Sequence, residues 1–189
     1  MAVNVPELHS RALAATRGIV AGIAPDQWTG PSVLEGMSVA DLVHHVVYGN
    51  FWVGPLMAGR SIADVGDEFE GDLLGTDPLA AYDRSSAVAD DAFKRPGAMT
   101  DLVAVSYGPV PGEVYAGHRF MDVLIHGWDL AASTGQPRTL DPELVAGCWE
   151  IVEPQARQLA AAGAFADPVP VPDDADPQTR LLALTGRAA

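Results

Sequence analysis

Three side chains that can bind a metal ion or carry a proton recur every four residues in the apolar stretch 117–132. They are His118, Asp122 and His126. Four residues make slightly more than one helical turn, so in a helix these side chains lie along one side. A carboxylate and an imidazole one turn apart can bind the same metal ion, but two ligands do not complete a site. The spacing therefore predicts a metal-binding helix that needs a ligand from elsewhere in the chain.

The adjacent histidines His44 and His45, inside a second apolar helix, are the obvious source of that ligand. Helical periodicity puts them on opposite flanks of the apolar face and leaves open which one points at a site. Two imidazoles and one carboxylate suit Zn²⁺ and also Ni²⁺, Fe²⁺ or Mn²⁺, and three protein ligands leave a position for water or substrate. The competing interpretation is a plain helix in which Asp122 and His126 form a local hydrogen bond.

Amphipathic periodicity, N-cap residues and proline or glycine stops predict the elements that position these residues. The expected helices cover about residues 6–24, 39–57, 78–94, 111–133, 142–161 and 177–184. Only residues 99–111 look extended, first at residues 102–105 and then at residues 107–109, and the prolines and glycines of this stretch argue against a long strand. We expect Val88 to face inward and His9 to be solvated. The pattern predicts an all-α four-helix bundle with an extra C-terminal helix and a Pro-rich tail, in a single domain over residues 1–189.

Composition narrows the classes of partner. The chain has 25 Asp plus Glu against 11 Lys plus Arg, a formal net charge of -14, and this charge repels phosphate backbones and anionic membranes. Cys148 is the single cysteine, so no intrachain disulfide can form. We see neither a signal peptide nor the roughly 18 apolar residues needed to span a bilayer. The sequence predicts a cytoplasmic protein with a small-molecule substrate and no nucleic-acid or membrane partner, and it leaves a homodimer open.

Two motifs resemble the DinB/YfiT-like metal-binding superfamily. The lead-in Gly36-Met37-Ser38-Val39-Ala40-Asp41-Leu42-Val43, followed by His44-His45, is similar to the superfamily's second-helix motif. The stretch Asp122-Val123-Leu124-Ile125-His126-Gly127-Trp128-Asp129-Leu130-Ala131 resembles an actinobacterial branch with a His-Gly-Trp-Asp-Leu-Ala signature. That branch is similar to the N-terminal domain of mycothiol-dependent maleylpyruvate isomerase. The resemblance extends from about Trp28 to the C terminus.

The resemblance implies a DinB-like bundle whose metal ligands are His45, Asp122 and His126. The thiol-dependent isomerases have Glu where this chain has Asp122, and Asp reaches one methylene less. It also implies a divalent metal, Zn²⁺ first, a thiol cosubstrate such as mycothiol, and a transferase or isomerase activity on a small electrophile. The isomerase's additional C-terminal domain is not expected here. The alternatives are a non-catalytic, metal-stabilised binding or accessory protein and a bundle without metal.

Four other residues are candidates for supporting roles. Asp129 either accepts a hydrogen bond from a ligating histidine or fixes the end of its helix. His118 is expected at the surface or the rim of a pocket, rather than as a ligand or a proton shuttle. Trp128 either lines a pocket or packs in the core, and His44 is expected to be packed or at the rim. Cys148 has no activating neighbour in sequence and is expected to be a buried, inert thiol.

Overall fold

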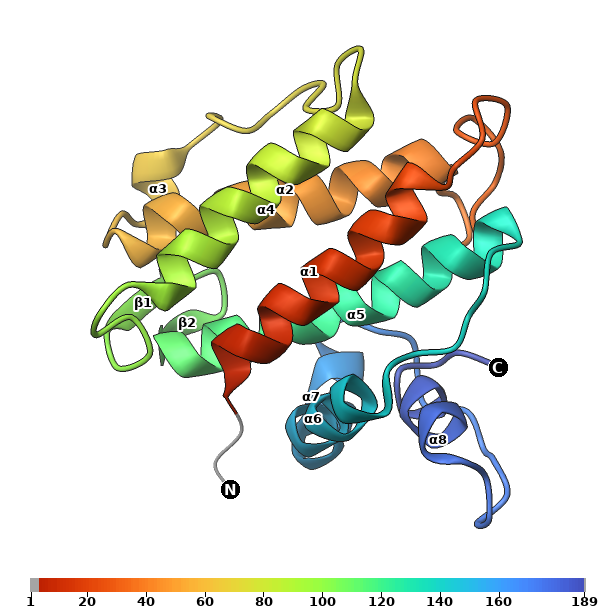
Figure 1. The fold of residues 1–189 in the computed structure, drawn as a ribbon. Helices are drawn as coiled ribbons and strands as arrows, with labels where there is room; N and C mark the ends of the chain where they lie inside the picture. The colour runs from red at the N-terminus through yellow and green to blue at the C-terminus, as the bar shows by residue number, and fades with distance from the viewer. Residues whose placement is uncertain (1–3, 189) are drawn as a thin grey trace. The chain divides into compact units, whose positions relative to one another are not determined.

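The computed structural model describes residues 4–188, which form two compact units, residues 4–138 and residues 139–188. The first unit contains α1 (Val5–Ala21), α2 (Val39–Met57), α3 (Ile62–Val65), α4 (Pro78–Lys94), β1 (Leu102–Val105), β2 (Gly108–Pro111) and α5 (Gly112–Thr134) (Figure 1). The second contains α6 (Pro142–Val152), a 3₁₀ turn (Glu153–Gln155), α7 (Ala156–Ala161) and α8 (Pro177–Leu184). The single domain over residues 1–189 stays a prediction.

Four long helices of the first unit pack side by side around a common core (Figure 1). α1 packs against α4 and α5, and α2 packs against the same two helices. The consecutive helices α1 and α2 therefore lie diagonally across the bundle, whereas α2 and α5 are neighbours. This arrangement confirms the predicted helical bundle, and it brings together the two helices that carry the candidate ligands.

Local sequence signals set the ends of those two helices. The Ser38 Oγ accepts a hydrogen bond from the Asp41 N–H, and the Asp41 carboxylate accepts one from the Ser38 N–H, which is the capping box expected at the start of α2. α5 ends before Gly135, whose φ of +69° is the left-handed conformation that glycine adopts most readily. Side chains of α2 and α5 fill the core, including Leu42, Val46 and Phe120, which are fully buried.

The predicted extended segment is a two-stranded hairpin. β1 and β2 pair antiparallel, with Val103 opposite Val110 and Leu102 opposite Pro111. The strands stay short because Pro109 and Pro111 have no N–H to donate to a longer ladder. The hairpin immediately precedes α5, so its turn can reach the side chains of that helix.

Residues 139–188 keep the predicted C-terminal helix but break the one before it. The helix expected over residues 142–161 is wrong as a continuous element, because Pro154 cannot donate to the preceding turn and a 3₁₀ segment separates α6 from α7. The Arg180 guanidinium of α8 lies over the Trp149 ring of α6, with its Cζ 4.9 Å from the ring centroid. Cys148 is fully buried, and burial raises the pKa of its thiol, so the expectation of an inert cysteine agrees with its surroundings.

Two expectations about the core are wrong. His9 is fully buried and packs edge-on against the Phe93 ring, with ring centroids 5.0 Å apart. Val88 is 38% exposed. It lies over Gly54, where an added Cβ would stand 2.7 Å from the Val88 Cγ1, so α2 and α4 approach too closely for this side chain to turn inward. Among residues 4–188, no helix has both the length and the apolar character needed to cross a membrane.

Candidate metal centre

α2 and α5 bring three side chains to one point. The His45 Nε2 lies 3.4 Å from the Asp122 Oδ1, and the His126 Nε2 lies 3.5 Å from the same oxygen. The two imidazole rings are nearly perpendicular, with centroids 4.9 Å apart. One donor atom from each residue lies within 4.8 Å of the other two. The three residues that the sequence singled out together therefore form one cluster, called the triad below.

The separations within the triad suit a small divalent cation. Metal–ligand bonds of about 2.0–2.2 Å in a tetrahedral site put neighbouring donor atoms roughly 3.3–3.6 Å apart. Both distances from the Asp122 Oδ1 fall in this range. The side chains of His45, Asp122 and His126 are 47%, 20% and 8% exposed, respectively. The triad is therefore anchored in the bundle on the α5 side and open to solvent at His45.

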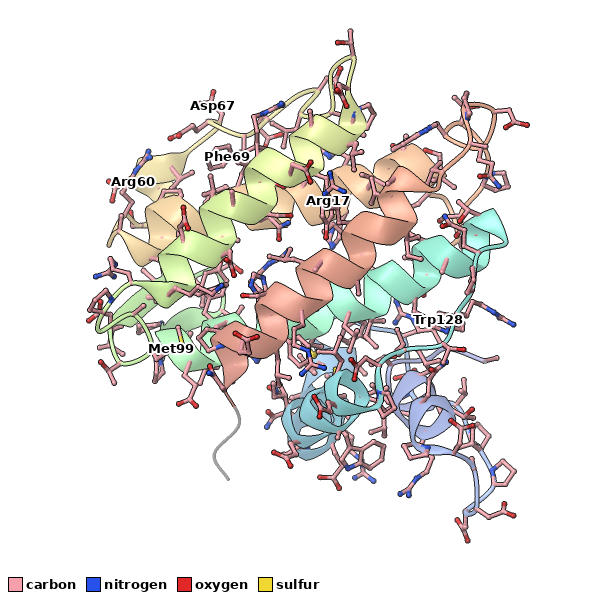
Figure 2. All side chains as sticks on the ribbon, viewed as in Figure 1. Arg17, Arg60, Asp67, Phe69, Met99 and Trp128 are labelled. Atoms are coloured by element: carbon pink, nitrogen blue, oxygen red, sulfur yellow. The ribbon has the colours of Figure 1, made fainter. Side chains whose placement is uncertain are left out.

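His44 points away from the triad. Its Nε2 lies 2.9 Å from the Gly71 carbonyl oxygen, in the segment between α3 and α4. The same segment covers the outer side of α2 through Phe69, which lies near α2 in Figure 2 and stacks on Phe51 with ring centroids 5.6 Å apart. The structure thus places His45, and not His44, beside Asp122 and His126, a point that helical periodicity had left open.

His118 lies outside the triad, on the side of the hairpin. Its Nδ1 is 2.7 Å from the hydroxyl of Tyr107, which sits in the turn between β1 and β2. Because tyrosine ionises only near pH 10, the hydroxyl keeps its proton at neutral pH. His118 is half-buried and one helical turn before Asp122, which agrees with the rim position expected from the sequence.

Asp129 fixes the orientation of the His126 ring. Its Oδ2 lies 3.0 Å from the His126 Nδ1, and its side chain is fully buried. A carboxylate in this position accepts the Nδ1–H, which leaves the lone pair of the Nε2 directed at the triad. Of the two roles weighed for Asp129, the structure shows the contact with a candidate ligand.

The two residues between His126 and Asp129 are explained by packing. An added Cβ on Gly127 would stand 2.3 Å from the Oγ1 of Thr16, which donates a hydrogen bond to the Val123 carbonyl. α1 can therefore approach α5 closely only if this residue is glycine. Trp128, labelled on α5 in Figure 2, is buried, and the Arg138 guanidinium lies 5.6 Å from its ring centroid. Trp128 is thus part of the core.

The sequence analysis missed Arg119, which is buried beside the triad. Its Nη1 donates to the Asp122 Oδ2 at 3.0 Å, and its Nη2 donates to the Asn50 Oδ1 at 3.1 Å. The Nη2 also lies 3.5 Å from the Val46 carbonyl oxygen. An arginine three residues before an aspartate can pair with it along a helix. That spacing, in the middle of an apolar face, was the available signal.

These contacts set the charges of the triad. Burial alone would raise the pKa of Asp122, but the charges of Arg119 and His126 and the hydrogen bonds from both histidines hold it well below its usual range. Burial would lower the pKa of His126, but the Asp122 charge and the hydrogen bonds with Asp122 and Asp129 raise it to about 9. Both shifts favour the charged forms of Asp122 and His126, and a metal ion would compete with the proton on His126.

A protein family and two curated mycobacterial proteins are similar to this chain. The sequence model of the mycothiol maleylpyruvate isomerase N-terminal domain family matches residues 9–131, which include the whole triad. Uncharacterized protein MT0763 of Mycobacterium tuberculosis strain CDC 1551 / Oshkosh and uncharacterized protein Rv0738 of strain ATCC 25618 / H37Rv are each 37% identical to it over 183 residues. Each alignment covers 95% of this chain and 95% of the relative. No solved structure matches the chain.

Proposed function

The chain belongs to the family of the mycothiol maleylpyruvate isomerase N-terminal domain, a DinB-like helical domain, and from that premise we propose a metal-dependent thiol chemistry. The protein would bind one divalent ion, with Zn²⁺ favoured over Ni²⁺, Fe²⁺ or Mn²⁺. It would act as a transferase or isomerase on a small electrophilic molecule, with a mycothiol-type thiol as cosubstrate. The proposal rests on one observation: the Nε2 atoms of His45 and His126 both lie beside the Oδ1 of Asp122, whose side chain is largely buried.

Each residue of the centre has a defined task in this proposal. A bound divalent ion would supply a Lewis acid that lowers the pKa of a thiol, so that thiolate exists near neutral pH. His45, Asp122 and His126 would hold the ion, and the Asp129 carboxylate keeps the His126 Nδ1 protonated. The exposed side of His45 gives a thiol access to the centre.

His118 is the residue best placed to orient an electrophile next to that thiol. It lies on the same side of α5 as Asp122, about 6 Å nearer the N-terminal end of the helix at the standard rise per residue. The Tyr107 hydroxyl, protonated at neutral pH, is at hydrogen-bond distance from its Nδ1 and holds the ring in place. A hydrogen-bond donor at this position would bind a carbonyl or carboxylate of the substrate.

Two measurements test the proposal. Elemental analysis of protein purified without a His tag and without chelator should find close to one equivalent of a transition metal. Incubation with a low-molecular-weight thiol and an electrophile should consume the thiol, and both chelator and His45→Ala should abolish the consumption. His44→Ala is the matched control, because His44 faces Gly71 instead of the triad. Thiol loss that survives chelator or His45→Ala would overturn the enzymatic proposal.

One observation favours a second candidate, a bundle that functions without turnover. Asp122 pairs with Arg119 and His126, so the side chains of the cluster balance the carboxylate charge among themselves. A stoichiometric metal without thiol consumption would leave a metal-stabilised binding or accessory protein. A protein that binds no added metal would leave a bundle in which the triad is only an ion pair.

We also propose a cytoplasmic location and a small-molecule partner. The formal net charge of -14 opposes binding to nucleic acid and to anionic membranes, and the single cysteine fits a reducing compartment. Electrophoretic mobility-shift and vesicle sedimentation assays should detect no binding, and size-exclusion chromatography with light scattering would decide between a monomer and a homodimer.

A further inference from the structure

We infer that Arg119 is a positioning residue that makes Asp122 a one-oxygen ligand and fixes the spacing between the two ligand-bearing helices. The inference rests on the proposed metal-binding function, and it adds a residue outside the triad whose loss should change how the ion is held. It starts from the fact that the two oxygens of Asp122 have different partners.

The Asp122 carboxylate is divided between two sets of neighbours. Its Oδ1 faces the Nε2 atoms of both histidines, at 3.4 and 3.5 Å. Its Oδ2 accepts the Arg119 Nη1–H at 3.0 Å. Because a charge-assisted hydrogen bond occupies the second oxygen, a metal ion is offered the first oxygen alone. Asp122 therefore cannot turn to bind through both oxygens without breaking an ion pair that is largely shielded from water.

The same guanidinium connects α5 to α2. Its Nη2 donates to the Asn50 Oδ1 at 3.1 Å, and the Asn50 side chain is fully buried. The Nη2 also lies 3.5 Å from the Val46 carbonyl oxygen, one residue after His45. A single planar group thus touches the Asp122 carboxylate on one helix and the backbone next to His45 on the other. Any movement of α2 relative to α5 would strain these contacts.

Gly49 makes room for this arrangement. A Cβ added at position 49 would stand 2.3 Å from the Arg119 Nη1 and 2.6 Å from both Cζ and Nη2. Any side chain at this position would push the guanidinium out of its place between the helices. The glycine, the arginine and the aspartate therefore form one packed unit, and changing the glycine disturbs it without removing a charge.

A lysine at position 119 could not make the same set of contacts. The guanidinium donates in two directions at once from a rigid plane, one N–H to the carboxylate and another to α2, whereas an ammonium is a compact point charge on a flexible stem. The positive charge also draws electron density from Asp122, so a bound cation would keep more of its own charge. Both effects favour a strongly polarising centre with open positions.

The test uses Co²⁺ as the probe, because its visible absorption weakens as its coordination number rises. Arg119→Met should weaken Co²⁺ binding by about 10- to 100-fold, the range typical of residues that orient metal ligands. It should also weaken the visible band, since Asp122 becomes free to bind through both oxygens. Arg119→Lys should restore part of the affinity but not the band. Full restoration of both by lysine would show that charge alone matters, and this would overturn the inference.

Gly49→Ala carries the test if Arg119→Met does not fold, because it leaves every charged group in place. It should shift Co²⁺ affinity and the visible band in the same direction as Arg119→Met, by a smaller amount. Gly54→Ala is the matched control on α2, since its added Cβ would meet Val88 of α4 and not Arg119 of α5. An unchanged spectrum and affinity in Gly49→Ala and Arg119→Met would overturn the inference.

A double-mutant cycle separates positioning from general support of the fold. If Arg119 acts through the Asp122 carboxylate as well as through α2, Arg119→Met should cause a smaller loss of Co²⁺ affinity in an Asp122→Asn background than in the wild type. An equal loss in both backgrounds would mean that Arg119 only stabilises the bundle. Failure of the proposed function looks different, because then the wild-type protein itself would bind no Co²⁺.

Discussion

The His126 Nδ1 lies 3.0 Å from the Oδ2 of Asp129, whose side chain is fully buried. This contact fixes which nitrogen of His126 is offered to a metal. Asp129→Ala should therefore weaken metal binding by about 10- to 100-fold while leaving the ligands in place. Zn²⁺ affinity measured by competition with a chromophoric chelator checks this. Asp83→Ala, which removes an exposed carboxylate paired with Arg17, is the control and should leave the affinity unchanged. An Asp129→Ala protein with wild-type affinity would contradict the role given to this contact.

The exposed member of the triad offers a clean comparison between neighbouring residues. A ligand present at about 100 times its Kd stabilises the native state by about 2.7 kcal/mol, so added Zn²⁺ should raise the melting temperature of the wild type by several degrees. His45→Ala should lose this increase. His44→Ala should keep it, because the His44 Nε2 lies 2.9 Å from the Gly71 carbonyl oxygen and not at the triad. Equal responses in the two variants would mean that His45 is not a ligand.

The part of the site that depends on one helix could be predicted from the sequence. Asp122 and His126 are one helical turn apart, and the Ser38–Asp41 capping box that starts α2 spans four residues. Short-range spacing therefore identifies the ligand pair and the start of α2. The selection of His45 over His44 needed the family resemblance, because the two lie on opposite flanks of the same apolar face. The structure agrees with it, since only His45 lies beside Asp122.

The parts that depend on contacts between helices could not be predicted. Arg119 pairs with Asp122 along α5, but its use of Asn50 is visible only once α2 and α5 are neighbours. His9 looked like a surface residue because a single histidine in an amphipathic helix carries no signal for burial. Its surroundings come from α4, where Phe93 covers the ring. Periodicity describes which way a helix faces, but not what the facing helix provides.

The burial of His9 predicts a loss of stability in acid. Burial, together with the charge of Arg119, lowers the pKa of His9 to about 3, and neither ring nitrogen has a hydrogen-bond partner within residues 4–188. The unfolded chain, with a histidine pKa near 6.5, binds more protons between pH 6.5 and 3, so the free energy of unfolding falls as the pH drops through this window. At pH 5, His9 lowers the free energy of unfolding by about 2 kcal/mol relative to neutral pH.

His9→Leu should remove that contribution. Urea unfolding at pH 7.5 and pH 5 gives the decrease in the free energy of unfolding between the two pH values. This decrease should be about 2 kcal/mol smaller in the variant than in the wild type. At pH 7.5 the variant should be at least as stable, because it no longer buries two unpaired polar atoms. His44→Leu, on the half-exposed outer side of α2, is the matched control. If His9→Leu keeps the full acid loss, groups other than this imidazole cause it.

The close approach of α1 to α5 at Gly127 predicts a coupled pair of substitutions. Gly127→Ala places a Cβ 2.3 Å from the Thr16 Oγ1 and should destabilise the protein by about 1–3 kcal/mol, since overpacking a filled contact forces the backbone apart. Thr16→Ala removes the hydroxyl that the new methyl group would meet, and with it the hydrogen bond to the Val123 carbonyl. The double variant should therefore lose less stability than the sum of the two single variants.

Gly18→Ala is the matched control on α1, where nothing lies within 4 Å of the added Cβ. There the higher helix propensity of alanine should raise stability by up to about 1 kcal/mol. Additive losses measured by denaturant unfolding would show that Gly127 does not set the α1–α5 distance. A Gly127→Ala variant with shifted helices should also bind Zn²⁺ more weakly, because Gly127 lies between His126 and Asp129, whose contact orients the His126 ring.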